Sequence, residues 1–387
     1  MAVIQRLAAA AFVLLSCCCA ARPAQRPELR GVWIATVDNI DWPSRRDLSS
    51  EEQKAELIRI YDRAASLGLN AVFLQVRPAA DAIYPAPDSP WSEYLTGAMG
   101  KPPQPLYDPL AFAIEEAHKR GLELHAWFNP FRARHASAQS PVAGPHLALR
   151  RPELVRTYGK QLWLDPGEAD AQREVLATIL DVVARYDVDG VHVDDYFYPY
   201  PEDGLAFPDD VSWRRYRADG GRMKRDDWRR SNINRFVRTM HSSVKNIRAD
   251  VLVGVSPFGI WRPRHPRQIR GFDAYDQLYA DSRLWLRRGW VDYLAPQLYW
   301  PIDRREQSFP ALLRWWLAQD RRGRGIVPGL AVYRVESGRP NAIPASEIER
   351  QIRMARRMGA RGFILFSARV LMEDRGGVNA AIVRARD

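Results

Sequence analysis

Two aspartates stand side by side in the segment Gly190–Pro201, which reads Gly-Val-His-Val-Asp-Asp-Tyr-Phe-Tyr-Pro-Tyr-Pro. Asp194 and Asp195 close an otherwise apolar, strand-like run. Neighbouring carboxylates are coupled, because the charge on one raises the pKa of the other. Cleavage of a glycosidic bond uses such a pair, with one carboxyl group as the acid and the other as base or nucleophile. The competing interpretation is structural: one aspartate caps the following turn and the other pairs with an arginine.

Other catalytic chemistries find little support in the residue pattern. All three cysteines lie at residues 17–19, so the rest of the chain has no thiol nucleophile, disulfide or thiolate metal ligand. His125 and His192 belong to no H-x-x-x-H or H-E-x-x-H pattern, which argues against zinc. Ser256 stands in Val-Ser-Pro-Phe-Gly, not in a nucleophile elbow, and no glycine-rich nucleotide motif follows the first strand. We therefore expect no metal and no cofactor.

The elements that must position the aspartates alternate along the chain. Eight strands are predicted at Gly31–Val37, Asn70–Val76, Glu123–Phe128, Gly190–Val193, Val251–Val255, Asp292–Leu298, Ile326–Val332 and Gly362–Phe366. Helices are predicted after Ser49 and after Asp108, and at Gln172–Tyr186, Asp227–Arg248, Asp281–Arg288, Ser308–Arg322, Pro344–Met358 and Val378–Arg386. This alternation predicts a (β/α)8 TIM barrel over residues 28–387, with long loops after strands three, four and five, at roughly 130–169, 196–227 and 257–280. An open doubly wound sheet is the alternative.

In such a barrel the active site lies at the C-terminal ends of the strands. The polar and aromatic residues near those ends are therefore candidate sugar ligands: Trp33, Arg77, Asn129, Arg132, His192, Tyr196, Gln297, Tyr299, Trp300 and Tyr333. Arg77 would hold a carboxylate in a bidentate contact, or else form a salt bridge within the barrel. Asp38 and Glu336 are further carboxylates near strand ends. About half of the aromatic residues would instead fill the core.

The first 27 residues have the pattern of a lipoprotein leader. Arg6 precedes an apolar run of nine residues, Leu7–Leu15, which is too short to span a bilayer. Leu14-Leu15-Ser16-Cys17 is similar to the bacterial lipobox, in which the cysteine is lipidated. We expect residues 1–16 to be a signal peptide, Cys17 to be lipidated and residues 17–27 to be a tether. A plain signal peptide, cut near Ala20 or Ala21, is the alternative.

The net charge of +11, from 57 basic and 46 acidic residues, favours anionic surroundings such as nucleic acid, lipid or an acidic polymer. Secretion and a carboxylate-lined barrel mouth argue against nucleic acid. We expect a glycan polymer as partner, and a membrane contact through the lipid, on the outer membrane facing the periplasm.

The composition, 46% hydrophobic and 27% charged, is that of a globular protein and excludes a disordered or polytopic membrane protein. The oligomeric state stays open.

Six motifs, in order, resemble glycosyl hydrolase-like family ten over about residues 28 to 370. They are Arg30-Gly-Val-Trp-Ile-Ala-Thr, Asn70-Ala-Val-Phe-Leu-Gln-Val-Arg-Pro, Ala126-Trp-Phe-Asn-Pro-Phe-Arg, Gly190–Pro201, Ala295-Pro-Gln-Leu-Tyr-Trp and Gly362-Phe-Ile-Leu-Phe-Ser. Members of that family are bacterial secreted or lipoprotein (β/α)8 hydrolases. The resemblance implies a glycoside hydrolase that cleaves glycan strands of the cell wall, expected to be peptidoglycan stripped of its stem peptides.

The family is similar at a distance to the α-amylase barrels, whose strand four carries the nucleophilic aspartate. Asp194 occupies that place, but His192 replaces the usual arginine, and strand five offers Ser256 where those enzymes carry an acidic residue. The two-carboxylate scheme of the amylases therefore does not transfer intact.

Two mechanisms stay open. In one, Asp194 is a direct nucleophile and Asp195, Glu336 or Asp38 is the acid and base. In the other, which we favour slightly, the acetamide of the substrate attacks, Asp195 is the acid and Asp194 polarises the acetamide, although the two roles could be exchanged. A non-catalytic lipoprotein that binds wall glycan is the alternative function.

Overall fold

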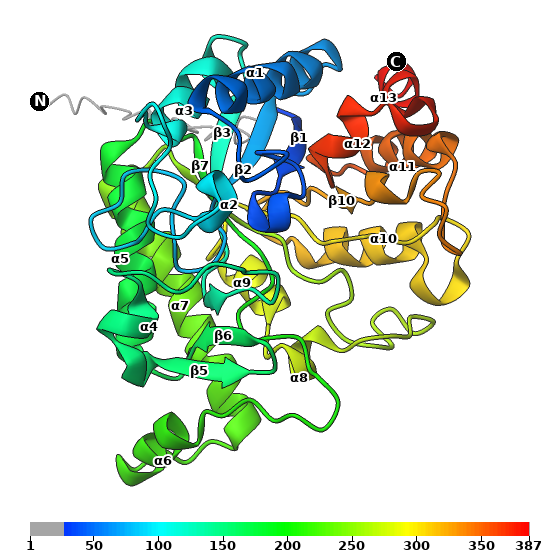
Figure 1. The fold of residues 1–387 in the computed structure, drawn as a ribbon. Coiled ribbons are helices and arrows are strands. Elements are labelled where there is room, and N and C mark those ends of the chain that lie inside the picture. Colours follow the sequence, from blue (N-terminus) through cyan, green and yellow to red (C-terminus); the bar gives the residue numbers. More distant parts are fainter. Residues whose placement is uncertain (1–26, 387) are drawn as a thin grey trace, which may run out of the picture.

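The computed structural model describes residues 27–386, which form a barrel of parallel strands surrounded by helices (Figure 1). Eight strands form one sheet in the order β10, β11, β1, β2, β3, β7, β8, β9. The bounds, in that order, are Gly329–Leu330, Gly362–Leu365, Leu29–Ile34, Ala71–Arg77, Glu123–Phe128, Gly190–Val193, Leu252–Val255 and Tyr293–Leu294. Each pair of neighbours is parallel. The predicted (β/α)8 barrel is thereby confirmed.

The two ends of this sheet, β9 and β10, join through isolated parallel bridges. Leu294 pairs with Ile326, and Gln297 pairs with Gly329. Both strands are shorter than the predicted Asp292–Leu298 and Ile326–Val332, because each of those runs contains a proline, Pro296 or Pro328. Proline has no N–H to donate, so it interrupts a ladder of hydrogen bonds. The barrel closes here through single bridges rather than through a continuous ladder.

Helices cover the outer face of the sheet, as the spacing of apolar residues predicts. The long ones are α1 (Ser50–Ser66), α3 (Pro109–His118), α5 (Ala169–Arg185), α7 (Arg225–Ile247), α10 (Phe309–Gln319) and α11 (Ala345–Arg357). The shorter ones are α2 (Glu93–Thr96), α4 (Leu147–Arg150), α6 (Asp210–Ala218), α8 (Ala274–Gln277), α9 (Ser282–Arg288), α12 (Ala368–Met372) and α13 (Val378–Arg384). Ser49 and Glu52 form the capping box of α1, and Asp108 caps α3 in front of Pro109.

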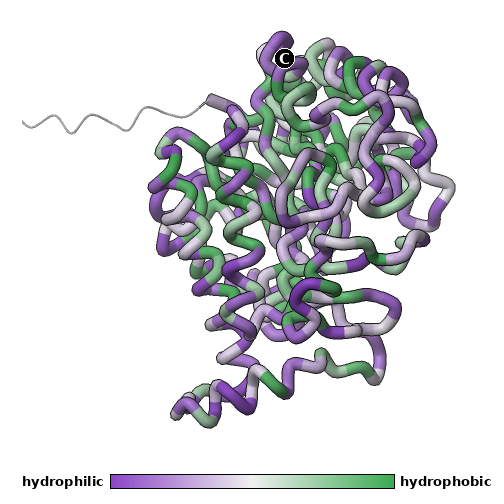
Figure 2. Tube along the Cα trace, turned by 60° about the vertical axis from the view of Figure 1, so that its left-hand side comes forward, coloured by the Kyte–Doolittle hydropathy of each residue, from purple (hydrophilic) through white to green (hydrophobic). Residues whose placement is uncertain are grey.

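The three long connections follow β3, β7 and β8, in agreement with the prediction. The first contains a small antiparallel sheet that the sequence analysis did not predict, in the order β4 (Arg132–Arg134), β6 (Gln161–Leu164), β5 (Val155–Tyr158). The second carries α6, which extends away from the barrel in both views (Figures 1 and 2). Because these segments follow the C-terminal ends of the strands, they build the walls around the barrel mouth.

Apolar side chains form two layers, one inside the barrel and one between strands and helices. Trp33, Phe73, Trp127, Tyr293 and Ile364 belong to the inner layer. The outer layer is larger and packs the amphipathic faces of the helices onto the sheet. Hydrophobic segments accordingly lie towards the middle of the trace and hydrophilic ones along the outer helices and α6 (Figure 2). Because these side chains fill the interior of the barrel, the cavity formed by its strands lies at the mouth.

The expectations for residues 1–16, for Cys17 and for the tether up to residue 26 concern residues outside the described part of the chain. Between residues 27 and 386, none of the helices combines the length and the apolar character that crossing a bilayer requires.

Candidate active site

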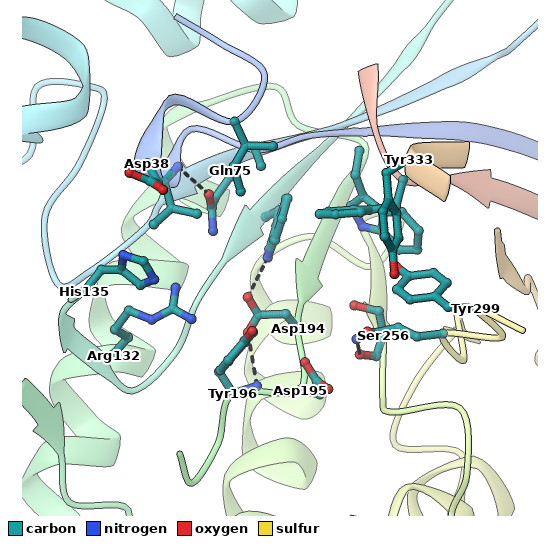
Figure 3. A pocket seen from close by; sticks show the side chains of 17 residues that line it. Asp38, Gln75, Arg132, His135, Asp194, Asp195, Tyr196, Ser256, Tyr299 and Tyr333 are labelled. Atoms are coloured by element: carbon teal, nitrogen blue, oxygen red, sulfur yellow. Dashed lines mark hydrogen bonds between the residues drawn. The ribbon is translucent and has the colours of Figure 1, made fainter. Parts of the chain in front are cut away.

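A cavity of about 280 Å³ opens at the C-terminal ends of the barrel strands (Figure 3). It is lined by Trp33, Ala35, Val37, Asp38, Ile40, Gln75, Trp127, Arg132, His135, Asp194, Asp195, Tyr196, Ser256, Gln297, Tyr299, Tyr333 and Phe366. Eight of the predicted site residues are in this set: Trp33, Arg132, Asp194, Asp195, Tyr196, Gln297, Tyr299 and Tyr333. Residues that lie far apart in the sequence therefore meet at the C-terminal ends of the strands, where the sequence analysis expected them.

Asp194 lies directly after β7 and is held by donors from the neighbouring strand. The indole Nε1 of Trp127 and the amide Nδ2 of Asn129 both donate to its Oδ2, at 3.0 Å and 3.1 Å. The backbone N–H of Tyr196 donates to Oδ1 over a longer distance, 3.4 Å. The side chain is only 4% exposed. Burial raises the pKa of Asp194 to about 7, with Arg132 lowering it and the charge of Asp195 raising it further. Near neutral pH this carboxyl group is thus available both with and without its proton.

Asp195 is buried next to Asp194 but has different partners. The Tyr200 hydroxyl donates to its Oδ2, and the side-chain amide of Gln297 donates to it as well. Gln297 in turn donates to the carbonyl oxygen of Ser256 at 3.0 Å. Burial raises the pKa of Asp195, while the bonds from Tyr200 and Gln297 lower it. These two donors favour the ionised form of Asp195.

Arg132 and Tyr196 form the wall next to Asp194. The guanidinium carbon of Arg132 lies 4.3 Å from the centroid of the Tyr196 ring. Asn129 connects this wall to Asp194, because its Oδ1 accepts the backbone N–H of Arg132 at 3.0 Å. Asn129 does not itself line the cavity, but it fixes two groups that do. His135 lies on the same wall; burial and the charge of Arg132 lower its pKa to about 4.

Aromatic rings form the opposite wall. Tyr299 contacts Tyr333 edge-on at 5.9 Å and stacks on Phe366 at 6.1 Å between ring centroids. Trp33 packs against Phe366 at 6.0 Å. Such rings offer flat apolar surfaces with a polar edge, which suit the apolar face of a sugar. In Figure 3 Tyr299 and Tyr333 stand across the cavity from Arg132 and His135.

Three predicted sugar ligands are placed elsewhere. The register of β2 shifts between Gln75 and Arg77. The Nη1 of Arg77 lies 3.4 Å from the hydroxyl of Ser89 and 3.5 Å from that of Thr178. His192 is inside the barrel beneath the cavity, bonded to the indole of Trp33, to Ser256 and to Tyr293 at 2.9–3.1 Å. Trp300 packs edge-on against Phe258 at 5.6 Å, outside the cavity wall. Arg77, His192 and Trp300 therefore contact the scaffold rather than the cavity.

The two further candidate carboxylates, Asp38 and Glu336, lie in different places. Asp38 lines the cavity rim in a left-handed backbone conformation, with φ 55°. Glu336 is exposed and lies against Gly376, away from the Asp pair. Of the two, only Asp38 can reach a ligand in the cavity.

Several lining residues were absent from the predicted set, among them Gln75, Trp127, His135, Ser256 and Phe366. Gln75 accepts the backbone N–H groups of Thr36 and Val37 at 3.1 Å and 2.9 Å, and so holds the loop after β1. A stricter use of strand alternation would have found Gln75 and Trp127, because residues two apart share a face. In the stretch from residue 27 to residue 386, no three His, Cys, Asp or Glu side chains gather into a group that would hold a metal ion.

Comparison with known proteins agrees with this architecture. Residues 28–344 match the family described as Glycosyl hydrolase-like 10. The chain is 42% identical over 364 residues to Glycosyl hydrolase YngK of Bacillus subtilis strain 168, covering 92% of this chain and 71% of YngK. It is 37% identical over 337 residues to Glycosyl hydrolase DigH of Escherichia coli K12, covering 81% of this chain and 75% of DigH.

Among solved structures, the glycoside hydrolase domain of PgaB (BpsB) from Bordetella bronchiseptica matches with a TM-score of 0.61 and 17% identity, over 92% of this chain and 98% of that domain. At this identity the match shows a common fold. With the family match over most of the barrel and two relatives above 30% identity, the chain belongs to the glycosyl hydrolase-like 10 family.

Proposed function

We propose that this protein is a glycoside hydrolase that cleaves the glycan strands of the bacterial cell wall. The observation that carries the proposal is the pair Asp194–Asp195: two adjacent buried carboxyl groups at the mouth of the barrel, one of which has a pKa of about 7. Acid–base cleavage of a glycosidic bond needs one carboxyl group that holds a proton and another that has lost it. The names of the relatives, glycosyl hydrolases YngK and DigH, support the same reaction type.

The electrostatics of the pair support one assignment of the two roles. Asp194 keeps its proton up to about pH 7 and is the general acid, which protonates the glycosidic oxygen as the bond to the anomeric carbon breaks. Asp195, whose ionised form accepts from Tyr200 and Gln297, is the carboxylate that interacts with the positive charge developing on the sugar or its acetamide. These roles are the reverse of those that the sequence analysis favoured, in which Asp195 was the acid and Asp194 polarised the acetamide.

An N-acetylated substrate fits this arrangement through substrate assistance. The acetamide oxygen attacks the anomeric carbon, the N–H donates to Asp195, and the leaving oxygen takes the proton of Asp194. Water then opens the cyclic intermediate and returns a proton to Asp194. Tyr299, Tyr333 and Trp33 supply the apolar wall for the sugar ring, and Asn129 orients Asp194.

Digestion of defined glycan strands tests the proposal. Purified strands with and without stem peptides are incubated with the wild-type protein, and mass spectrometry of the new ends identifies the bond that is cut. Cleavage of peptide-free strands at a rate that Asp194→Asn abolishes is the expected result. Binding of the strands without any cleavage by the wild type would instead indicate a non-catalytic glycan-binding lipoprotein.

We also propose that Cys17 carries a lipid that anchors the protein to the outer membrane, facing the periplasm. The support is the nine-residue apolar run in front of Leu-Leu-Ser-Cys. A Cys17→Ala variant is expected to stay unprocessed or to become soluble, and fractionation of labelled cells measures this. Normal processing and membrane recovery of that variant would contradict the lipid anchor.

A further inference from the structure

The connection between β7 and α7 forms an arm that carries α6 away from the barrel (Figures 1 and 2). Residues 211–224 of this arm contain five basic residues and one acidic residue, Asp219, which gives a net charge of +4. The basic residues are all exposed: Arg214, Arg215, Arg217, Arg222 and Lys224. This short stretch therefore carries a large share of the net charge of +11 of the whole chain.

Four of these five cations have no carboxylate partner. Arg215 pairs with the buried Glu168. The other four, which we call the arm cations, take part in no ion pair within residues 27–386: Arg214, Arg217, Arg222 and Lys224. Exposed charges of one sign that the chain does not compensate attract partners of the opposite sign. The arm cations are therefore suited to a partner that carries several negative charges.

The arm is held firmly against the barrel. Trp213 and Tyr216 of α6 pack on each other and on Trp228 of α7, with ring centroids 5.3–5.8 Å apart. Asp209, directly before α6, is fully buried and accepts the Nε of Arg229 of α7 at 2.7 Å. Because the large rings of α6 face α7, the cations are left at the surface of a helix whose position is fixed.

The arm belongs to the side of the barrel where the cavity opens. It follows the C-terminal end of β7, directly after the Asp pair, whereas the described chain enters the barrel at the N-terminal end of β1. In Figure 1 β1 lies in the upper half of the molecule and α6 at its lower end. The lipid proposed at Cys17 would thus join the chain on the opposite side. The arm is placed to contact the polymer that approaches the cavity.

We propose that residues 211–224, α6 with the turn after it, are a docking surface for the acidic peptides of the cell wall. The inference rests on the proposed function for the choice of the wall, but it concerns a surface separate from the cavity. The peptides that branch from wall glycan carry free carboxylates, and the mesh presents them in many copies. Each exposed ion pair is weak, but several formed together hold the cavity close to the polymer.

A membrane matches this surface less well. A helix that lies in a lipid surface inserts its large apolar side chains between the lipids. In α6 the rings of Trp213 and Tyr216 pack on Trp228 instead, so that Val211 and Met223 are the exposed large apolar side chains of residues 211–224.

Cosedimentation with insoluble wall sheets tests the docking surface. The variant Arg214→Gln/Arg222→Gln/Lys224→Gln removes three of the arm cations and leaves Arg217, which lies over the Trp213 ring. Its affinity for the sheets should be about 5- to 50-fold lower than that of the wild type, the combined effect of three exposed ion pairs. Its rate on short soluble glycan strands should stay unchanged, because none of the three residues lines the cavity.

The matched control is Arg288→Gln/Arg321→Gln/Arg357→Gln, which removes the same charge. These three arginines are exposed and take part in no ion pair within the described residues. They lie at or just after the C-terminal ends of α9, α10 and α11, on the side of the barrel where the strands begin. The control should bind the sheets like the wild type. Thermal unfolding of both triple variants shows whether they fold.

Two further probes identify the partner. Sheets whose peptide carboxylates have been converted to methylamides should bind the wild type as weakly as untreated sheets bind the arm variant. Vesicles of one part phosphatidylglycerol and three parts phosphatidylethanolamine should bind the wild type and the arm variant equally. A loss of binding by the arm variant on the vesicles but not on the sheets would assign the arm to a membrane and overturn the inference.

Equal losses in the two triple variants, or tight binding of the wild type to the methylamide sheets, would also overturn it. The outcome for the proposed function is read separately, from cleavage of the soluble strands. If the wild type cuts no glycan but binds the sheets through the arm, the docking surface stands and the hydrolase proposal fails. If it cuts the strands and the arm variant binds the sheets as tightly as the wild type, only the docking surface fails.

Discussion

The indole Nε1 of Trp127 donates a hydrogen bond to Oδ2 of Asp194 over 3.0 Å. Asn129 donates to the same oxygen, so two strong donors occupy one side of the carboxyl group. The other oxygen, Oδ1, has only the longer contact from the Tyr196 N–H, at 3.4 Å. When Asp194 takes up a proton, the proton therefore resides on Oδ1. The chain thus distinguishes the two oxygens of its proposed acid before any substrate binds.

Asp194→Asn and Asp195→Asn should each lower the turnover of wall glycan by about 10²–10⁴-fold or more, because each removes a group that transfers or stabilises charge. The side-chain oxygen of an asparagine can still accept from Trp127 or Tyr200, so both variants should fold. An aryl glycoside with an acidic leaving group separates the roles, because its cleavage needs no proton. Asp194→Asn should retain much more activity on this substrate than Asp195→Asn does. The opposite pattern would assign the acid to Asp195.

The pH dependence of kcat/KM should follow the proton of Asp194. With a pKa of about 7, this group loses its proton as the pH rises, and activity should fall above that value. Trp127→Phe removes a donor that favours the ionised form, so the falling limb should move to higher pH. Initial rates on peptide-free strands between pH 5 and 9 measure both effects. If kcat/KM falls at the same pH in the wild type and in Trp127→Phe, a group other than Asp194 is titrating.

The same pKa predicts a stability effect with a defined sign. The folded pKa of Asp194, about 7, lies above its ordinary value of 3.8, so between these values the folded state holds more protons than the unfolded state. The contribution of this group is fully present below pH 3.8 and is lost as the pH rises through 7, at roughly 1.4 kcal/mol per unit. Asp194→Asn removes that loss. The Tm of the variant relative to wild type should therefore be higher at pH 8 than at pH 4. A difference that does not change with pH would contradict the raised pKa.

The barrel, and the position of Asp194 and Asp195 at its mouth, could be predicted because local pattern and tertiary fold agree there. The run Gly190–Val193 is apolar and short, and parallel strands all end at one edge, so Asp194 and Asp195 had to reach the barrel mouth. Strand alternation fails for Arg77, since the irregularity between Gln75 and Arg77 in β2 breaks the period of two. His192 shares the inward face with Asp194 but lies one layer deeper, where Trp33 and Tyr293 fill the barrel.

The antiparallel sheet was missed because it lies in a long connection that has no helix-and-strand alternation. Its hairpin does have a sequence signal: Val155–Tyr158 and Gln161–Leu164 are separated by Gly159 and Lys160, and Gly159 adopts φ 55°. A two-residue turn with glycine between apolar alternating runs is a hairpin pattern. No local signal reveals that this sheet carries Arg132 to the cavity, since the distance between Arg132 and Tyr196 depends on the closed barrel.

Asp41 joins the segments that follow β1 and β11, the first and the last strand of the barrel along the chain. Its Oδ2 accepts the Ala35 N–H at 2.8 Å, and its Oδ1 accepts Ser367 and the Arg369 N–H at 2.7 Å and 2.8 Å. Asp41→Asn replaces one accepting oxygen by an NH2 group that faces these donors, and should lower stability by about 1.5–3 kcal/mol. Ala35 and Phe366 line the cavity, so KM should rise while the pH profile stays unchanged. Glu373→Gln, at an exposed position nearby, is the control. If Asp41→Asn has the Tm and KM of the wild type, Asp41 does not hold these two segments together.

The acetamide of the substrate should be required for cleavage. In the substrate-assisted route the acetamide oxygen forms the bond to the anomeric carbon, and its N–H donates to Asp195, which Tyr200 and Gln297 hold in place. Strands whose sugars have lost the acetyl group lack both the nucleophile and this N–H. They should resist cleavage, and a thiazoline that imitates the cyclic intermediate should inhibit competitively. Chemical re-acetylation of the same strands is the matched control and should restore the rate. If de-N-acetylated strands are cut at the normal rate, one of the two aspartates attacks the sugar directly, and an activated fluoro-sugar should then trap the covalent adduct for mass analysis.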